Sequence, residues 1–170
     1  NLNLKARIGF NTSNTKNRDF TPKFNYGTGK IYTNANSSVT LGKINDNDYT
    51  FDLFNTYENT FADDHDVTFL VGMTAYETNG EGLFGSRTGV QANSWKFADL
   101  SSANGAGEEQ TNSSYSYKLR RLSYFGRIQY AFQDKYLLSA MLRRDSSTKF
   151  GPNNRVAYFP SATAGWVISE

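Results

Sequence analysis

The sequence predicts an all-β fold, an antiparallel transmembrane β-barrel segment of about six strands with long outer loops and short turns. Three observations favour it. Apolar and polar residues alternate with a period of two in several runs, as a half-buried strand requires. Aromatic residues make up 15% of the chain and suit a pleated sheet. Short and long connections alternate between the runs, which is typical of outer-membrane barrels.

The first half of the chain contains three predicted strands. Residues 2–11 alternate clearly, and residues 67–76 alternate again after a compact polar turn at 62–66. Residues 49–61 also read as extended, but Asn55, Asn59 and Phe54 interrupt their alternation, so the facing of this strand stays open. Between the predicted strands 2–11 and 49–61, residues 12–48 are expected to be a polar loop, with weak strand signals at 30–33 and 38–43.

Residues 77–116 are expected to form a second long loop, because they are polar and contain six glycines. Three aromatic residues in this segment are candidate ligand-binding residues, since exposed rings stack on the apolar faces of sugars or peptides. The alternative is that these rings pack the loop onto itself or onto a partner. The candidates are Phe84, Trp95 and Phe97.

The second half contains a hairpin of residues 121–132 and 136–143 around a tight turn at 133–135, then a polar loop at 145–154 and a last strand at 161–168. A charge on the lipid side of a barrel costs roughly 2–4 kcal/mol at the bilayer midplane, so the apolar set should face lipid and the polar set the lumen. The expected lipid-facing residues are Leu122, Tyr124, Ile128, Tyr130, Leu138, Leu142, Trp166 and Ile168, and the expected lumen-facing residues are Arg121, Arg127, Gln129 and Arg143.

The asymmetry of the connections predicts a topology. Short turns lie on the periplasmic side of outer-membrane barrels and long loops lie outside the cell. Phe61, Tyr130, Phe132 and Tyr136 cluster beside the short turns, where an aromatic girdle would meet the lipid headgroups. A β-sandwich also alternates apolar and polar residues, and the pattern alone leaves it open.

Composition argues against several functions. A net charge of +2 without a basic cluster gives no sign of a nucleic-acid partner. Cys 0 rules out Cys-ligated zinc and a Cys nucleophile. A His-dependent catalytic triad or a multi-His metal site would have to be built from His65 alone, so we expect no enzyme, metal or cofactor. Asp52 and Glu58 lie six residues apart on one strand, roughly 20 Å, too far for a glycosidase pair. Asp63, Asp64, His65 and Asp66 could bind a hard cation, but a solvated turn is the favoured interpretation.

The last third of the chain resembles the SusC/RagA-like TonB-dependent transporters. Residues 122–130, LSYFGRIQY, are similar to the family segment LSYFGRVNY, and residues 134–140, DKYLLSA, to its D-[KR]-Y-L-L-[ST]-A. Residues 142–155 resemble LRRDGSSRFGPNNRW, and residues 159–170 resemble FPSASAGWRISEE. These blocks occur in the family's order and spacing. Ser146 and Val156 depart from it, which affects only the local loop shape.

The resemblance implies a large, 22-stranded outer-membrane barrel of a Gram-negative bacterium, with residues 1–170 as part of one barrel domain. It also implies a plug domain and a TonB-binding segment elsewhere in the protein, a SusD-like surface lipoprotein as partner, and glycans or peptides as substrates. Alone in water, the segment is expected to aggregate, because its apolar face and two strand edges would be uncovered. The alternatives are a soluble or surface-attached glycan-binding β-sandwich and a surface barrel that does not transport.

Overall fold

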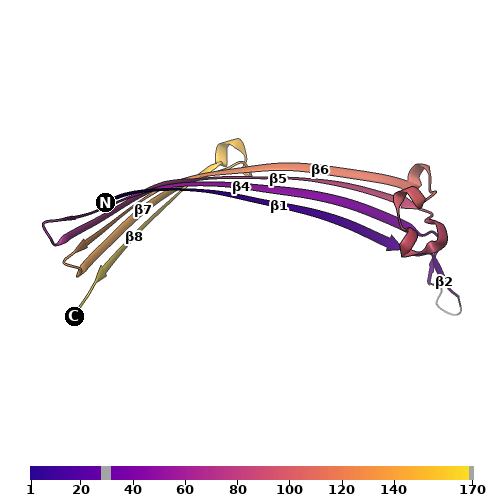
Figure 1. The fold of residues 1–170 in the computed structure, drawn as a ribbon, viewed down its shortest axis with the longest axis horizontal. Coiled ribbons are helices and arrows are strands. Elements are labelled where there is room, and N and C mark those ends of the chain that lie inside the picture. The colour runs from indigo at the N-terminus through magenta and orange to yellow at the C-terminus, as the bar shows by residue number, and fades with distance from the viewer. Residues whose placement is uncertain (28–31, 169–170) are drawn as a thin grey trace. The chain divides into compact units, whose positions relative to one another are not determined.

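The structure, a computed structural model, describes residues 1–27 and 32–168. One sheet of six strands has the order β1-β4-β5-β6-β7-β8, and β2 and β3 pair separately (Figure 1). This confirms the predicted all-β antiparallel fold, and no helix in the described part is long and apolar enough to span a membrane. The strands are β1 Leu2–Thr21, β2 Phe24–Tyr26, β3 Tyr32–Asn34, β4 Ser38–Phe61, β5 His65–Thr88, β6 Gln110–Phe132, β7 Tyr136–Ser147 and β8 Val156–Trp166. Short 3-10 turns are η1 Gln91–Asn93, η2 Trp95–Phe97, η3 Leu100–Ser102, η4 Gly107–Glu109 and η5 Pro152–Asn154.

The chain divides into two compact units. Unit 1 comprises Asn1–Asn11, Asp48–Thr78 and Lys118–Glu170, and unit 2 comprises Thr12–Asn47 and Asn79–Tyr117. The strands β1, β4, β5 and β6 contribute residues to both units, whereas β7 and β8 belong to unit 1.

Two short turns join the long strands of unit 1, as predicted. The first lies between β4 and β5 and the second between β6 and β7. Both begin with two residues of positive φ: Ala62 (48°) and Asp63 (63°) in one, Gln133 (51°) and Asp134 (51°) in the other. Left-handed residues of this kind match the twist of the flanking strands of a tight hairpin.

Both predicted long loops contain long stretches of strand, and this corrects the sequence analysis. The segment 12–48 contains the end of β1, the hairpin β2–β3 and the start of β4 at Ser38. The weak strand signal at 38–43 is therefore confirmed, whereas the signal at 30–33 is met only by β3 from Tyr32 onward, because residues 28–31 lie outside the described part. In the segment 77–116, β5 continues to Thr88 and β6 begins at Gln110, so the connection is only 89–109.

The last predicted strand, 161–168, is present but shifted: β8 runs over Val156–Trp166. Likewise β7 continues to Ser147, so the polar loop expected at 145–154 is shorter. In this register Tyr158 pairs with Arg144 and Val156 with Ser146, which extends the ladder past the polar residues at the end of β7. The backbone hydrogen bonds between strands form without any alternation of apolar and polar side chains. The polar residues at these strand ends therefore gave no sign of a strand in the sequence.

Unit 1 has no apolar core among its described residues. The buried apolar residues of the described chain, Val39, Val90, Ala98 and Ala103, all belong to unit 2, and the buried side chains of unit 1 are Asp52 and Ser123. Large apolar side chains are exposed instead, for example Ile8 at 83%. A sheet in water hides its apolar face against a second layer, so this face needs a covering that the chain itself does not supply.

Candidate functional site

The six-stranded sheet of unit 1 has one apolar face. In the antiparallel register Tyr124 pairs with Arg144, Ile128 with Ala140 and Tyr130 with Leu138, and paired residues point to the same side. The next pairing adds Ala164 opposite Leu138. Seven of the eight residues that we expect to meet lipid therefore share one face, and Ile168 follows the end of β8 with the same parity. We name this set the apolar face: Leu122, Tyr124, Ile128, Tyr130, Leu138, Leu142 and Trp166.

The opposite, polar face holds a network of charged groups. Arg7 on β1 binds Asp52 on β4 through Nε at 2.8 Å and Nη2 at 2.7 Å, and Thr74 on β5 donates to the same carboxylate at 2.8 Å. Further along, Arg143 binds Asp145 at 2.7 Å, and the guanidinium of Arg121 lies 4.3 Å from the centre of the Tyr76 ring.

The four residues expected to face a lumen all belong to this polar face. Arg121 pairs with Ser147, Arg127 with Met141 and Gln129 with Ser139, while Arg143 pairs with Phe125. The Nε atom of Arg127 is buried and has no hydrogen-bond partner among residues 1–27 and 32–168. A buried donor without a partner is costly, which makes this face a candidate for contact with a further part of the protein.

Contacts also determine the facing of the strand 49–61, which the sequence left open. Phe54 lies on the polar face, where its ring is 5.9 Å from that of Phe125. Tyr49 lies on the apolar face, 5.2 Å from the ring of Phe10. Phe54 interrupts the alternation because it packs against an aromatic residue of β6, a contact that the local sequence does not reveal.

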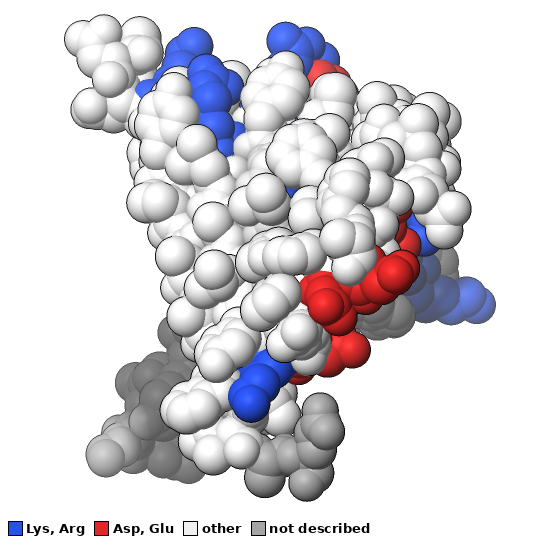
Figure 2. Space-filling model, turned by 90° about the vertical axis from the view of Figure 1, so that its left-hand side faces the viewer, with Lys and Arg blue, Asp and Glu red and all other residues white. Residues whose placement is uncertain are grey.

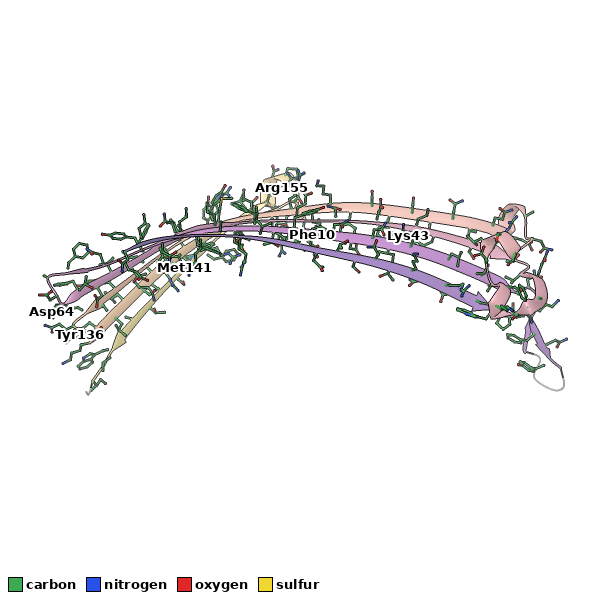
Figure 3. The ribbon with its side chains drawn as sticks, in the orientation of Figure 1. Phe10, Lys43, Asp64, Tyr136, Met141 and Arg155 are labelled. Carbon is green, nitrogen blue, oxygen red and sulfur yellow. The ribbon has the colours of Figure 1, made fainter. Side chains whose placement is uncertain are left out.

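Aromatic rings gather where the short turns lie. His65 Nδ1 and the Tyr130 hydroxyl are 2.6 Å apart, and the His65 ring is 4.8 Å from that of Phe132. From Phe132 the row continues to Tyr136 and then to Trp166, with ring centres 6.3 Å apart at each step. Tyr136 lies at the same end as the turn residue Asp64 (Figure 3). The sequence analysis predicted an aromatic girdle here from Tyr130, Phe132 and Tyr136, but not His65 or Trp166. It also included Phe61, whose side chain is half-exposed.

Viewed from this end, most of the visible surface is uncharged; most of the acidic side chains form one patch, and a further one lies apart beside a basic side chain (Figure 2). The described residues contain no group of three or more His, Cys, Asp or Glu placed to hold a metal ion. Thr60 donates to Asp66, and His65 contacts Tyr130 instead. Asp52 is likewise engaged by Arg7 and Thr74.

Charged residues border the apolar face away from the short turns. Glu77 binds Lys118 at 2.7 Å and Arg120 at 2.7 Å. Beside this ion cluster is an open hollow of about 760 Å³ whose lining is otherwise mainly apolar. Its apolar lining residues include Ile8, Phe10, Phe51 and Leu122. An apolar surface that ends at ion pairs matches the change from hydrocarbon to headgroups at a membrane interface.

Unit 2 contains a row of aromatic rings that lie over glycines. A Cβ atom built on Gly82 would lie 2.4 Å from Cε1 of Tyr115, and one on Gly80 would lie 2.5 Å from Cε1 of Tyr117. On Gly42 it would lie 2.7 Å from Cδ1 of Phe84. Each ring thus occupies the space of a missing side chain, which explains why glycines stand inside these strands. We call Phe84, Tyr115 and Tyr117 the aromatic row.

The three candidate ligand-binding residues are not one cluster. Phe84 lies in β5 rather than in a loop, and its ring is 6.2 Å from Tyr115. Trp95 and Phe97 lie in η2 and are half-exposed, with Arg18 4.7 Å from the centre of the Trp95 ring. No ring contact joins Phe84 to either of them among the described residues. Tyr115 and Tyr117 were missed because the glycines around them were interpreted as loop.

The connection 89–109 packs on its own unit. Val90, Ala98 and Ala103 are buried against Val39, and Leu100 packs beside them. Asp99 caps η3, and the hydrogen bonds from the Ser101 amide and hydroxyl lower the pKa of its carboxyl. This small core accounts for a defined loop structure, and Phe84, Trp95 and Phe97 are not among its members.

No family model matches the chain. The chain is 30% identical over 176 residues to TonB-dependent receptor P39 of Formosa agariphila, covering 99% of this chain and 16% of the relative. It is 27% identical over 169 residues to TonB-dependent receptor P3 of the same organism, and 30% identical over 147 residues to TonB-dependent receptor SusC of Bacteroides thetaiotaomicron. The chain thus spans 13–16% of the length of the relatives that it matches.

A solved structure agrees with these sequences. The RagAB peptide transporter superposes with a TM-score of 0.81 and 25% identity, over 95% of this chain and 17% of the other. The RagAB peptide importer in its open-open state matches equally well. The motifs, the six-stranded antiparallel sheet and these matches identify the chain as a member of the SusC/RagA-like TonB-dependent receptors, which are outer-membrane proteins of Gram-negative bacteria.

Proposed function

We propose that this chain forms part of the barrel wall of a TonB-dependent transporter that imports glycans or peptides with a SusD-like lipoprotein. The observation that carries the proposal is the two-sided sheet of unit 1, apolar on one face and charged on the other, in a chain similar to TonB-dependent receptors. The wall supplies no chemistry. It closes the backbone hydrogen bonds within lipid, which only helices and closed barrels can do.

The apolar face meets lipid in this proposal, and the polar face lines the lumen. Residues exposed on the apolar face include Leu138 at 54% and Leu142 at 53%. Buried charge is found on the other side, where Asp52 is held by Arg7. Placing that charged pair in hydrocarbon would cost far more free energy than placing leucines there. The apolar face is therefore the one assigned to lipid, and the polar face the one assigned to the lumen.

Strand lengths support a membrane location. A transmembrane β-strand needs roughly 9–11 tilted residues to cross the hydrocarbon. β7 has 12 residues and β8 has 11, which suits one crossing. β4 and β5 have 24 residues each, about twice that need, so these strands continue beyond the hydrocarbon.

The partners follow from the relatives. RagAB is named as a peptide transporter, and SusC as a TonB-dependent receptor. For this protein we propose a SusD-like surface lipoprotein that delivers substrate, and TonB, which supplies energy through a plug outside this chain. Residues 1–170 are then part of one barrel domain. The relatives' names are those of receptors and transporters, and we propose that this protein is likewise no enzyme and holds no cofactor.

Uptake by cells tests the proposal. The full-length gene and its neighbouring lipoprotein gene would be deleted together and singly in the native bacterium, and growth on single glycans and peptides compared with growth on monosaccharides or amino acids. Loss of growth on an oligomer alone, restored by the intact gene and by no variant that lacks the TonB-binding segment, is the expected result. Unimpaired growth on every oligomer would contradict transport and favour a surface barrel with another role.

A β-sandwich that binds glycans would behave differently in extraction. The full-length protein should stay with the outer membrane in high salt and carbonate, and leave it only in detergent. Release by buffer alone would contradict the barrel wall.

A further inference from the structure

The aromatic row of unit 2 presents ring faces outward from the sheet. Tyr115, Tyr117 and Phe84 each cover a glycine of the neighbouring strand, so one face of every ring lies against backbone. The outward side remains accessible, and Tyr115 is 46% and Tyr117 41% exposed. Rings that only filled gaps in a core would be buried on both faces.

The rings form a continuous strip. The Phe84 and Tyr115 centres are 6.2 Å apart with planes at 27°, and those of Tyr115 and Tyr117 are 6.5 Å apart with planes at 17°. The Tyr117 hydroxyl crosses Gly80 and donates to Asp46 on β4 at 3.0 Å, which holds its ring in place. Such a strip is a preorganised surface, since few rotamers are left to lose on binding.

The polar groups around the strip are hydroxyl, amide and carboxylate. The Thr40 hydroxyl donates a hydrogen bond of 3.0 Å to the Ser86 hydroxyl. The side chain of Asn17 lies close to the position that a Cβ atom on Gly42 would occupy, where the Phe84 ring packs. Within unit 2, the basic residues of β1, β4 and β5 have the other parity and therefore point to the other side of the sheet. They are Lys16, Arg18, Lys43 and Arg87.

We propose that the aromatic row is a stacking site for a neutral glycan. A pyranose ring has an apolar C–H face that lies on an aromatic face, and hydroxyls at its edge that bond to acceptors such as Asp46. An anionic glycan or phosphate would need the cations that lie on the other side. A peptide bound as an added strand would need a free sheet edge, but β4, β5 and β6 each have neighbours on both sides.

The inference rests on the proposed function, because the lumen is the path of the substrate. Tyr115 and Tyr117 are odd-numbered residues of β6, as are Arg121 and Arg127, which we assign to the lumen. The row thus names a substrate class, neutral oligosaccharide, among the two that the family resemblance leaves open.

The test uses the full-length transporter in detergent with its lipoprotein partner. It would first be applied to an array of neutral glycans, acidic glycans and peptides, and the best neutral glycan then titrated by calorimetry. Tyr115→Ala and Tyr117→Ala should each weaken binding roughly fivefold, from the value of one aromatic contact. Gly82→Val keeps the Tyr115 ring but displaces it, and should weaken binding as much. Tyr117→Phe keeps the ring face and should lose less.

Tyr124→Ala is the matched control, because Tyr124 has a similar exposure of 45% but lies on the apolar face. It should leave glycan affinity unchanged. Retention of the lipoprotein and a normal heat-dependent gel shift show for each variant that the barrel is folded. A variant that fails this check is replaced by Tyr115→Leu, which retains bulk without a ring.

Three results would overturn the inference: no neutral glycan retained by the wild type, unchanged affinity in the folded row variants, or an acidic glycan or peptide whose binding depends on the row. Energised uptake by the wild-type cells is measured in parallel. If uptake persists while the row variants bind normally, the glycan site is wrong and the transporter stands. If no uptake occurs, the proposed function itself fails.

Discussion

Arg7 and Asp52 form an ion pair between the neighbouring strands β1 and β4, in which the arginine is exposed to solvent and the aspartate is buried. The Arg7 side chain is 73% exposed, whereas that of Asp52 is 4% exposed, and their closest atoms are 2.7 Å apart. Thr74 supplies a second donor to Asp52 from β5. A single carboxylate thus connects three neighbouring strands on the polar face.

Removal of either partner of this contact should have unequal effects. Arg7→Ala leaves a buried carboxylate with only the Thr74 hydroxyl, so we expect a loss of roughly 1–3 kcal/mol in the unfolding free energy. Asp52→Ala leaves Arg7 in solvent, where it is hydrated, and should cost less. The midpoint of urea unfolding of the full-length barrel in detergent would measure both. A larger loss for Asp52→Ala would contradict the solvent-open geometry.

A second prediction concerns the glycines inside strands. A Cβ atom on Gly72 would lie 2.6 Å from Cζ of Phe125 and 3.0 Å from the Leu53 carbonyl oxygen, whereas on Gly126 the nearest atom is 3.9 Å away. Gly72→Ala should therefore destabilise by about 1–3 kcal/mol through overpacking. Gly126→Ala, in the adjacent strand, should be neutral or slightly stabilising. The same urea series compares the two, and equal midpoints would show that Phe125 moves aside freely.

Period-two alternation predicted the strands of unit 1 because each side of that sheet has its own kind of surroundings. Residues 2–11 and 121–132 alternate along their length, and the register confirms that Leu122, Tyr124 and Ile128 share a face. Where both faces are polar the signal disappears. This is why the extension of β1 to Thr21 and of β5 to Thr88 could not be recognised.

The aromatic row shows why the candidate site was only partly predictable. Gly80 and Gly82 indicated a loop, since glycine usually weakens a strand. Their structural reason, the rings of Tyr115 and Tyr117, lies more than thirty residues away and becomes a neighbour only through strand pairing. The sequence analysis singled out Phe84 as an aromatic residue in a polar segment. The aromatic row to which it belongs could be recognised only once the strand pairing was known.

The proposed topology can be tested with single cysteines, because the chain has Cys 0. Ser101 lies in η3 of the connection 89–109, and Asp134 lies in a short turn. A membrane-impermeant maleimide should label Ser101→Cys on intact cells and Asp134→Cys only after the outer membrane is opened. Both variants should label after lysis, which controls for accessibility. Labelling in the reverse order would invert the topology.

The isolated chain should not be a soluble monomer. β1 and β8 end the six-stranded sheet, so each would offer an unpaired edge, and the apolar face would be uncovered. Exposed apolar residues such as Leu2 at 71% and Ile8 at 83% would make that face associate with other apolar surfaces in water. Residues 1–170 expressed alone should elute as aggregates unless detergent is present. A monomeric peak in buffer with cooperative unfolding would instead favour a self-contained sandwich.

The lipid assignment can be decided at the middle of the two shortest strands of the sheet. Leu142 pairs with Gly126 and Pro160 on the apolar face, and Ser161 pairs with Met141 on the other. Both lie near the centre of strands of 12 and 11 residues, so they share one depth in the membrane. Leu142→Arg should cost roughly 2–4 kcal/mol and reduce the folded protein in the outer membrane, because arginine would enter hydrocarbon.

Ser161→Arg should be tolerated by comparison, since a wet lumen hydrates the charge. The folded yield is measured from the heat-dependent gel shift of outer-membrane fractions. Fluorescence of a probe on Leu142→Cys, quenched by brominated lipid, provides a readout that does not depend on stability, and the same probe on Ser161→Cys should not be quenched. Quenching at Ser161 and not at Leu142 would exchange the two faces, placing the Arg7–Asp52 contact on the lipid side, where hydrocarbon would penalise it most.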